Sequence, residues 1–125
     1  MAPSFKVYED DQALAFMDIN PFNEGHALAI PKAHFINLLD VSEDAMSATI
    51  NAAQRAARAI EKTISPDGIN LIQANGPGAA QSVMHFHIHI LPRKFGDEAP
   101  INWGLRPGNQ AVIADLAEKL MGANE

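Results

Sequence analysis

The stretch HFHIHIL, residues 85–91, decides the fold prediction because it alternates polar and apolar residues without a break. Strict alternation is typical of a half-buried β-strand, in which side chains two residues apart project to the same face. The three histidines therefore share one face, and Phe86, Ile88 and Ile90 point the other way into a core. We expect this strand to run from about residue 82 to residue 91.

Three interpretations fit the bare histidine pattern: a metal site, a catalytic centre, or a polar strand face without special chemistry. Imidazole suits zinc or copper, and a neighbouring pair could share an ion. However, each strand residue advances by about 3.3 Å, so His85 and His89 would lie about 13 Å apart. The chain has no cysteine, so only His26, His34 or a carboxylate could complete a tetrahedral site.

The rest of the chain predicts an α+β fold with an antiparallel sheet of about five strands, one long helix and a C-terminal helix. Strands are expected in two pieces within residues 5–19, at 26–31 and, as a short buried strand, at 69–73; the second helix is expected at 109–121. The chain of 125 residues is most simply one domain, residues 1–125.

The long helix, about residues 42–64, is predicted from apolar residues that recur every three or four positions. They are Met46, Ile50, Ala53, Ala57, Ile60 and Ile64. We expect this stripe to face the core. Asp40 or Ser42 can cap the start of the helix, and the segment Ser65-Pro66-Asp67-Gly68 ends it.

Composition excludes several classes of function. The net charge of −6 argues against a protein that binds nucleic acid polymers, since these present a basic face. The absence of cysteine excludes disulfides and thiol catalysis. The N-terminal stretch lacks the apolar core of a signal peptide, and no apolar run approaches the ~20 residues of a membrane span. We expect a cytoplasmic protein without membrane partners.

The loop before the histidines favours anion chemistry. Residues 75–82, NGPGAAQS, can offer backbone N–H groups, amides and a hydroxyl to a phosphate. A neutral imidazole is a suitable nucleophile toward a phosphate ester, because it brings no negative charge against an anionic group. Nearby donors can stabilise the charge on the phosphate oxygens. The loop has Ala79 and Ala80 where a glycine would tolerate positive φ.

The segment 85–91 resembles the signature of the histidine triad (HIT) family of nucleotide hydrolases and transferases, in the form found in bacterial HIT-domain proteins. The resemblance covers about residues 5–95, ahead of a C-terminal tail and helix at 96–125. The tail after Lys94, FGDEAPINWGLRPGN (95–109), matches no branch closely. The resemblance includes AFMDINP (15–21), GHALAIPKAH (25–34) and ANGPGAAQSVMHFHIHILPR (74–93) in the family's order.

The resemblance implies catalytic roles for four histidines. His87 is similar to the nucleophile that takes the nucleotidyl group, and His89 to the phosphate contact beside it. His85 matches an orienting histidine, and His26 matches a fourth position that supports the triad from a neighbouring strand. His34, in a loop, is expected to be a surface residue.

The resemblance also implies a nucleotide pocket. Asp18 matches a residue that binds the ribose hydroxyls, and Ile19 one that lines the base pocket. Asn75, Gln81 and Ser82 match positions that hold the α-phosphate, and Ser82 is a candidate to protonate the leaving group. From the residues alone, Asp18 could instead cap the turn into Asn20-Pro21, and Asn75 could belong only to a turn.

The implied function is hydrolysis at the α-phosphorus of purine nucleoside 5′-phosphoramidates or dinucleoside polyphosphates, through a nucleotidyl-histidine intermediate. No cofactor or protein-bound metal is expected, although magnesium could accompany a polyphosphate. The resemblance implies a homodimer whose sheets join edge to edge, with Trp103 and Arg106 as candidates to cover the chain's own pocket or its partner's. The alternative is a non-catalytic nucleotide- or metal-binding module that acts in sensing or partner docking.

Overall fold

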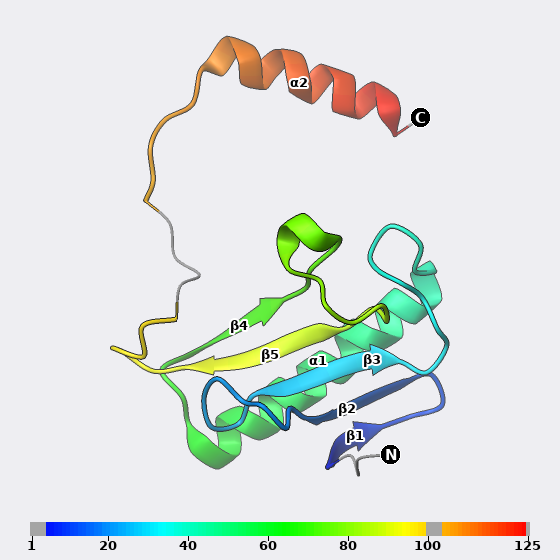
Figure 1. Cartoon of the computed structure of the whole chain (residues 1–125), viewed down its shortest axis with the longest axis vertical. Helices are drawn as coiled ribbons and strands as arrows, with labels where there is room; N and C mark the ends of the chain where they lie inside the picture. Colours follow the sequence, from blue (N-terminus) through cyan, green and yellow to red (C-terminus); the bar gives the residue numbers. More distant parts are fainter. Residues whose placement is uncertain (1–4, 100–103, 125) are drawn as a thin grey trace.

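The computed structural model describes residues 5–99 and 104–124, so Trp103 lies outside the described residues. Five strands form one antiparallel sheet in the order β1-β2-β3-β5-β4 (Figure 1). The elements along the chain are β1 (Lys6–Glu9), β2 (Ala13–Met17), β3 (Ala27–Pro31), α1 (Glu43–Ile64), β4 (Gly68–Ile72), a 3-10 turn (Pro77–Ala79), β5 (Ile88–Arg93) and α2 (Gln110–Ala123). The predicted α+β class and five-stranded antiparallel sheet are confirmed.

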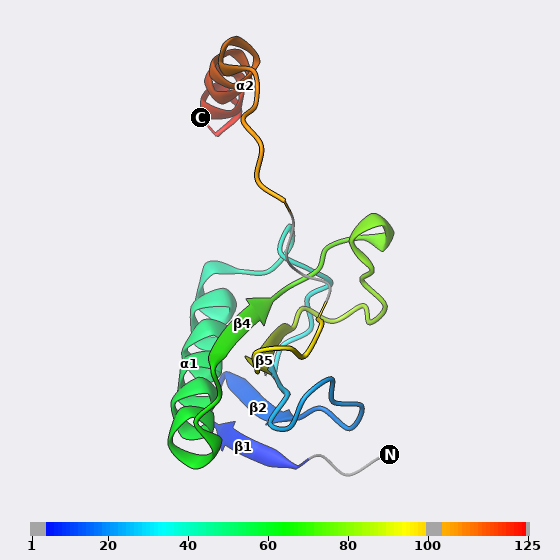
Figure 2. The same ribbon diagram turned by 90° about the vertical axis from the view of Figure 1, so that its left-hand side faces the viewer.

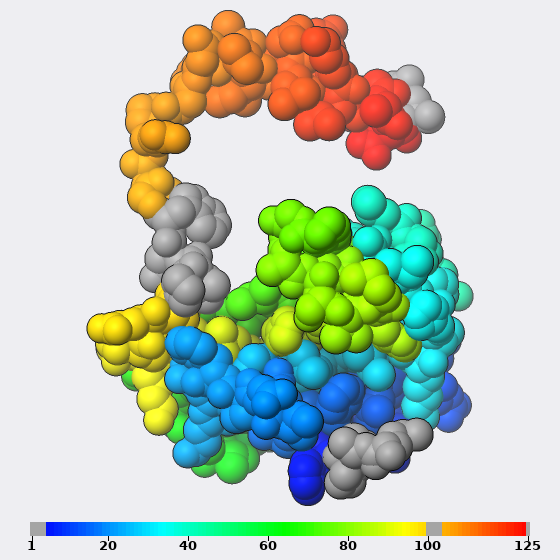
Figure 3. Space-filling view, in the orientation of Figure 1, coloured from blue at the N-terminus to red at the C-terminus, as the bar shows by residue number. Residues whose placement is uncertain are grey.

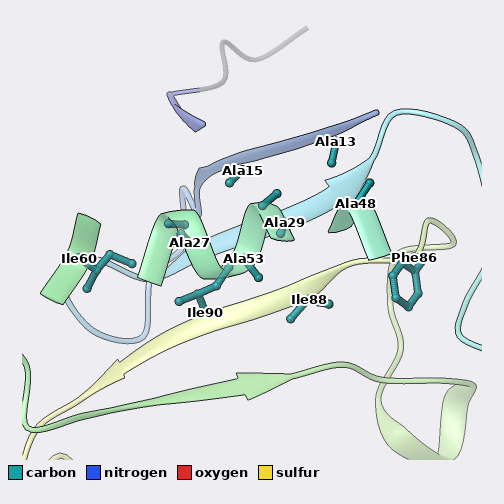
Figure 4. Close-up of a cluster of buried hydrophobic side chains, with 12 residues drawn as sticks. Ala13, Ala15, Ala27, Ala29, Ala48, Ala53, Ile60, Phe86, Ile88 and Ile90 are labelled. Atoms are coloured by element: carbon teal, nitrogen blue, oxygen red, sulfur yellow. The ribbon is translucent and has the colours of Figure 1, made fainter. Parts of the chain in front are cut away.

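Helix α1 covers one face of the sheet through alanines (Figure 4). The strands contribute the fully buried Ala13, Ala15, Ala27 and Ala29, and the helix contributes Ala48, Ala52, Ala53 and Ala56. Small side chains on both surfaces let the helix approach the sheet closely. Larger residues complete the cluster: Ile60 and Phe86 are buried at its two ends, and Ile90 is buried between them (Figure 4).

The predicted core stripe of α1 is wrong at its N-terminal end. Met46 and Ile50 are 37% and 45% exposed, whereas Ala53 and Ile60 are buried as expected. The helix instead turns Ala48, Ala52 and Ala56 toward the sheet, where they meet the alanines of the strands. The start of α1 follows one of the two predictions: the Ser42 side chain accepts a hydrogen bond from the backbone N–H of Ala45.

Two strand predictions need correction. The strand at 69–73 was expected to be buried, but β4 is an edge strand, and its Leu71 is 49% exposed. The histidine strand was expected from residue 82, but its ladder begins only at Ile88. The alternation still holds before that point: Phe86 is buried, and His85 and His87 are half-buried. Side-chain periodicity thus extends beyond the hydrogen-bonded strand.

The opposite face of the sheet carries loops instead of a helix. Figure 2 shows α1 on one side of the sheet and the loops after β2 and β4 on the other. Helix α2 stands apart from the sheet and from α1 (Figures 1 and 2). Within the described part of the chain, neither helix combines the length and the apolar character that a bilayer crossing requires.

Candidate active site

The register of the strands gathers the candidate residues on the face away from α1. Leu28 in β3 pairs with Phe16 in β2 and with His89 in β5. Residues two positions further along each strand lie on the same face. A cavity of about 160 Å³ opens here, lined by Phe16, Leu28, Ile30, Val83, His85 and His87. The triad thus stands beside an apolar floor.

His87 is held by the backbone just before it. Its Nδ1 lies 2.8 Å from the carbonyl oxygen of His85. A carbonyl can only accept, so Nδ1 carries the hydrogen, and the lone pair of the neutral ring lies on Nε2. Nε2 makes no hydrogen bond to any residue of 5–99 or 104–124. A half-buried imidazole with a free Nε2 lone pair can act as a nucleophile.

A chain of three hydrogen-bonded groups orients His89. The backbone N–H of Phe22 donates to Nδ1 of His26 at 3.1 Å, so neutral His26 carries its hydrogen on Nε2. That Nε2–H donates to Nδ1 of His89 at 2.9 Å. His89 must then carry its own hydrogen on Nε2, where it can donate to a ligand. The rings of His87 and His89 meet edge to face, with centroids 5.0 Å apart.

Burial keeps this chain of groups neutral. Desolvation lowers the pKa of His26, and the nearby Asp18 carboxylate opposes it only in part. Desolvation also lowers the pKa of His89, and a positive charge on His87 or His26 would lower it further. Lowered pKa values favour the neutral tautomers that the hydrogen bonds require.

Glycine at position 25 makes the approach of His26 possible. Gly25 has φ of +89°, and a Cβ atom added there would lie 2.7 Å from Cδ1 of Ile64. Only glycine adopts this backbone without strain. The GH pair in the sequence therefore combines a sharp turn against α1 with a buried imidazole.

His85 and His34 both bind backbone carbonyls. His85 donates from Nε2 to the carbonyl oxygen of Pro31 at 2.9 Å, a contact that suits an orienting role. His34 is exposed, as expected, but its Nε2 donates to the carbonyl oxygen of Met84 at 2.7 Å. His34 therefore ties the loop after β3 to the segment before the triad. The sequence carries no signal for this contact.

The amides of Asn75 and Gln81 join the two loops on this side of the sheet. Gln81 accepts from the N–H of Gly76 and donates to the carbonyls of Ile36 and Val83. Asn75 accepts from the N–H of Leu38 and exchanges hydrogen bonds with Gln73. Both amides are thus engaged within the protein, and their contact with an α-phosphate stays a prediction. Ser82 is exposed beside them.

Ala80 has the positive φ that a glycine at this position would tolerate more easily. Its φ is +63°, so the loop does require a left-handed conformation at this position. A side chain there costs energy that glycine would not.

Asp18 caps the turn that follows β2. Its Oδ1 accepts from the N–H of Asn20 at 2.8 Å, which is the turn cap considered as the alternative. Its Oδ2 lies 3.5 Å from Nε2 of His26. Ile19 next to it is 64% exposed and is available to a ligand. Binding of ribose and base by this pair remains a prediction.

The residues that could hold a cation are Asp18, His26 and His89, whose ligand atoms lie within 4.8 Å of one another. Nε2 of His26 and Nδ1 of His89 already share a hydrogen bond. A metal ion bound through these two nitrogens would have to replace that bond and the proton in it. No other such group of three exists among the described residues.

Known proteins are similar to this chain in sequence. The family model for the HIT domain matches residues 1–96. Protein hit of Bacillus subtilis is 44% identical over 91 residues, which are 73% of this chain and 63% of that protein. Adenylylsulfatase HINT3 of Arabidopsis thaliana is 40% identical over 77% of this chain and 49% of its own length.

A solved structure extends the similarity to almost the whole chain. The crystal structure of SMU.412c from Streptococcus mutans is 36% identical and covers 99% of this chain and 79% of that chain, with a TM-score of 0.92. The chain therefore belongs to the histidine triad (HIT) family.

Proposed function

We propose that this protein hydrolyses purine nucleoside 5′-phosphoramidates or dinucleoside polyphosphates at the α-phosphorus. The observation that carries the proposal is the bond from Nδ1 of His87 to the carbonyl of His85, which leaves the lone pair on Nε2. The name of the Arabidopsis relative, an adenylylsulfatase, supports a substrate in which an adenylyl group is transferred.

In the proposed reaction, Nε2 of His87 attacks the α-phosphorus and forms a P–N bond. The bond from phosphorus to the leaving nitrogen or oxygen breaks, and its electron pair departs with the leaving group, which takes up a proton. Water then attacks the same phosphorus, breaks the bond to Nε2 and releases the nucleoside monophosphate. One hard displacement is thereby divided into two easier ones.

His89 is proposed to bind the phosphate through its Nε2–H. Its tautomer is set by the bond from His26, so the donor is in place before substrate arrives. Donors fixed in advance stabilise developing charge without reorganisation. The exposed Ser82 hydroxyl is proposed to give the leaving group its proton. A polyphosphate substrate could bring Mg²⁺ with it.

The nucleoside is proposed to lie across Asp18 and Ile19. The carboxylate of Asp18 would bind the ribose hydroxyls through Oδ2, and Ile19 offers an exposed apolar surface to the base. Gln81 and Asn75 are proposed to act through the loop that they hold, which presents backbone N–H groups to the α-phosphate.

A homodimer joined at the β4 edge is also proposed. β4 is one of the two sheet edges, and an unpaired edge readily pairs with another chain. Beside it lies an open groove of about 520 Å³, lined by Ile50, Asn51, Ala53, Gln54, Ala57, Ile69 and Leu71. Pairing of two β4 strands would bury the exposed side chains of Ile50 and Leu71.

The second candidate function is a non-catalytic module that binds a nucleotide or a metal. One observation favours the metal: Asp18, His26 and His89 offer three ligand atoms in one place. Stoichiometric zinc that remains in the purified protein after dialysis, and is lost from His26→Asn, would support this alternative.

The deciding experiment compares the wild-type protein with His87→Asn on adenosine 5′-phosphoramidate and diadenosine tetraphosphate. We expect AMP from at least one substrate, and a loss of roughly 10³-fold or more in kcat for the variant. Asparagine can still donate to the His85 carbonyl but has no nucleophilic nitrogen, so thermal unfolding should hardly change.

A quenched reaction of the wild type should also show the protein with one nucleotidyl group added, by mass spectrometry. Equal turnover by His87→Asn, or no AMP from either substrate, would contradict the proposed function.

A further inference from the structure

The carbonyl of His85, which orients His87, lies outside the sheet. Strand β5 begins only at Ile88, and residues 83–87 belong to no strand. The ladder of hydrogen bonds that fixes the carbonyls of a strand therefore does not reach His85. Because Nδ1 of His87 binds this carbonyl, the orientation of the proposed nucleophile depends on what else holds the residues before β5.

Residues 31–35, at the end of β3 and in the loop after it, hold residues 84–86 by three hydrogen bonds. The bonds join Nε2 of His85 to the carbonyl oxygen of Pro31 at 2.9 Å, the N–H of Phe86 to the carbonyl oxygen of Phe35 at 2.6 Å, and Nε2 of His34 to the carbonyl oxygen of Met84 at 2.7 Å. Figure 3 shows the loop after β3, in cyan, against the segment before β5, in yellow-green. The backbone on both sides of His85 is therefore fixed by contacts that are distant in sequence.

The N–H of Phe86 and the carbonyl of His85 belong to one peptide group. A peptide group is planar and trans, so its N–H and its C=O point in opposite directions. The N–H points to the carbonyl of Phe35. The carbonyl of His85 therefore points away from Phe35, and it meets Nδ1 of His87 at 2.8 Å. The loop after β3 thus sets the direction of the acceptor that fixes the tautomer of His87.

His34 supplies the one of these bonds that comes from a side chain outside the triad. Its acceptor, the carbonyl of Met84, belongs to the peptide group before His85, whereas Phe35 binds the peptide group after it. The rings of His34 and His85 also meet edge to face, with centroids 5.1 Å apart. His34 itself is exposed, so its side chain contributes contacts to this segment and little to the core.

We propose that His34 is a positioning residue for the reaction of His87. It holds the peptide group before His85, so that the His85 carbonyl keeps the ring hydrogen of His87 on Nδ1. Without this contact the carbonyl can turn, and the ring can carry its hydrogen on either nitrogen. A neutral ring with its hydrogen on Nε2 has no lone pair there with which to attack. The inference rests on the proposed function, in which Nε2 of His87 attacks phosphorus.

The kinetic test compares the wild type with His34→Ala and His34→Gln on adenosine 5′-phosphoramidate and diadenosine tetraphosphate. His34→Ala should lower kcat by about fivefold to tenfold, the usual effect of one lost hydrogen bond. KM should change little, because the contact does not involve the nucleotide. His34→Gln keeps an N–H near the place of Nε2 and should restore most of kcat.

The second readout needs no substrate. In protein labelled with ¹⁵N-histidine, the ring nitrogen shifts show which nitrogen of a neutral imidazole carries the hydrogen, and the signals that disappear in His87→Asn belong to His87. We expect the hydrogen on Nδ1 of His87 in the wild type and in His34→Gln. In His34→Ala both tautomers should appear. A contact that only supports the fold would lower the midpoint of thermal unfolding and leave the tautomer of His87 as it is.

His34→Asn provides a second variant, because its amide is too short to reach the Met84 carbonyl. It keeps a polar side chain at the surface and should behave as His34→Ala does in both measurements. An unchanged tautomer of His87 in His34→Ala and His34→Asn, or a kcat equal to that of the wild type, would overturn the role of His34. No AMP from the wild type would instead contradict the proposed function, whatever the tautomer of His87.

Discussion

The two faces of the sheet are formed by the same strands, but one face forms the core and the other carries the candidate site. Toward α1 the strands present Ala27, Ala29 and Ile90, all fully buried. Away from α1 they present Leu28 and His89, half-buried beside the free nitrogen of His87. One step along the chain therefore moves from the core to the candidate site. Stability and chemistry are carried by different faces, so substitutions should be able to separate them.

The largest difference between an effect on stability and an effect on activity is expected from Leu28 and Ala29, which are neighbours in β3. Ala29→Leu forces three extra carbon atoms between the sheet and α1, and should lower the free energy of unfolding by about 1–3 kcal/mol. Leu28→Ala removes part of the apolar floor of the site, and should mainly raise KM for the nucleotide. Urea unfolding and steady-state kinetics of the two variants test this contrast. Similar losses of stability in both would show that the faces are not independent.

A smaller loss of stability is expected at low pH, because His26 is buried and His89 is half-buried on the sheet face away from α1. The folded-state pKa values of His26 and His89 are lowered by burial. Below the ordinary histidine pKa of about 6.5, the unfolded chain then binds more protons than the folded protein. The free energy of unfolding should therefore decrease as the pH falls through this range.

Urea unfolding of the wild type at pH 7 and at pH 5.5 measures this decrease. His26→Asn should show a smaller decrease, and His34→Asn, which replaces an exposed histidine, should keep most of it. A decrease of the same size in His26→Asn as in the wild type would contradict the assignment to the buried pair.

The smallest change in stability is expected from the loop of residues 75–82, which lies on the sheet face away from α1 (Figure 2). Ala80 has φ of +63°, a conformation that costs a side chain about 1 kcal/mol. Ala80→Gly removes that cost but adds flexibility to the unfolded chain, worth about 0.4–1 kcal/mol, so the net change should be a gain of about 0.5 kcal/mol or less.

Ala79→Gly adds the same flexibility without relieving a positive φ, and should destabilise the protein. Thermal unfolding of the two variants gives the comparison. If Ala80→Gly is the less stable of the two, the loop is not strained at Ala80 in solution.

Local patterns predicted the elements of the fold well. The helix at about 42–64 was predicted within one residue of its observed bounds, because its cap at Ser42 and its stop after Ile64 are local signals. The burial of Met46 was predicted wrongly, since a helical period fixes a stripe but not which side of the stripe meets the sheet. The exposure of Leu71 was missed for a related reason: an apolar run has the same appearance in a central strand and in an edge strand.

In the candidate site too, some features could be predicted from the sequence and others could be seen only in the structure. Alternation in residues 85–91 was enough to predict that the three histidines share a face, and the family resemblance pointed to His26 and Asp18. No local pattern indicated that His34 binds the carbonyl of Met84, or that Gln81 holds two loops together. These contacts join residues about 50 positions apart.

By itself, the sequence determined which side chains alternate and where the helices begin and end, because both depend on neighbours within a few positions. The tertiary structure decided which tautomer His89 adopts. His26 reaches it across 63 positions of sequence, and only the pairing of β3 with β5 brings the two rings together. A hydrogen bond donated to one ring nitrogen of a neutral imidazole places the ring's own hydrogen on the other nitrogen. In His89 the donor is His26, and the two come together only in the folded protein.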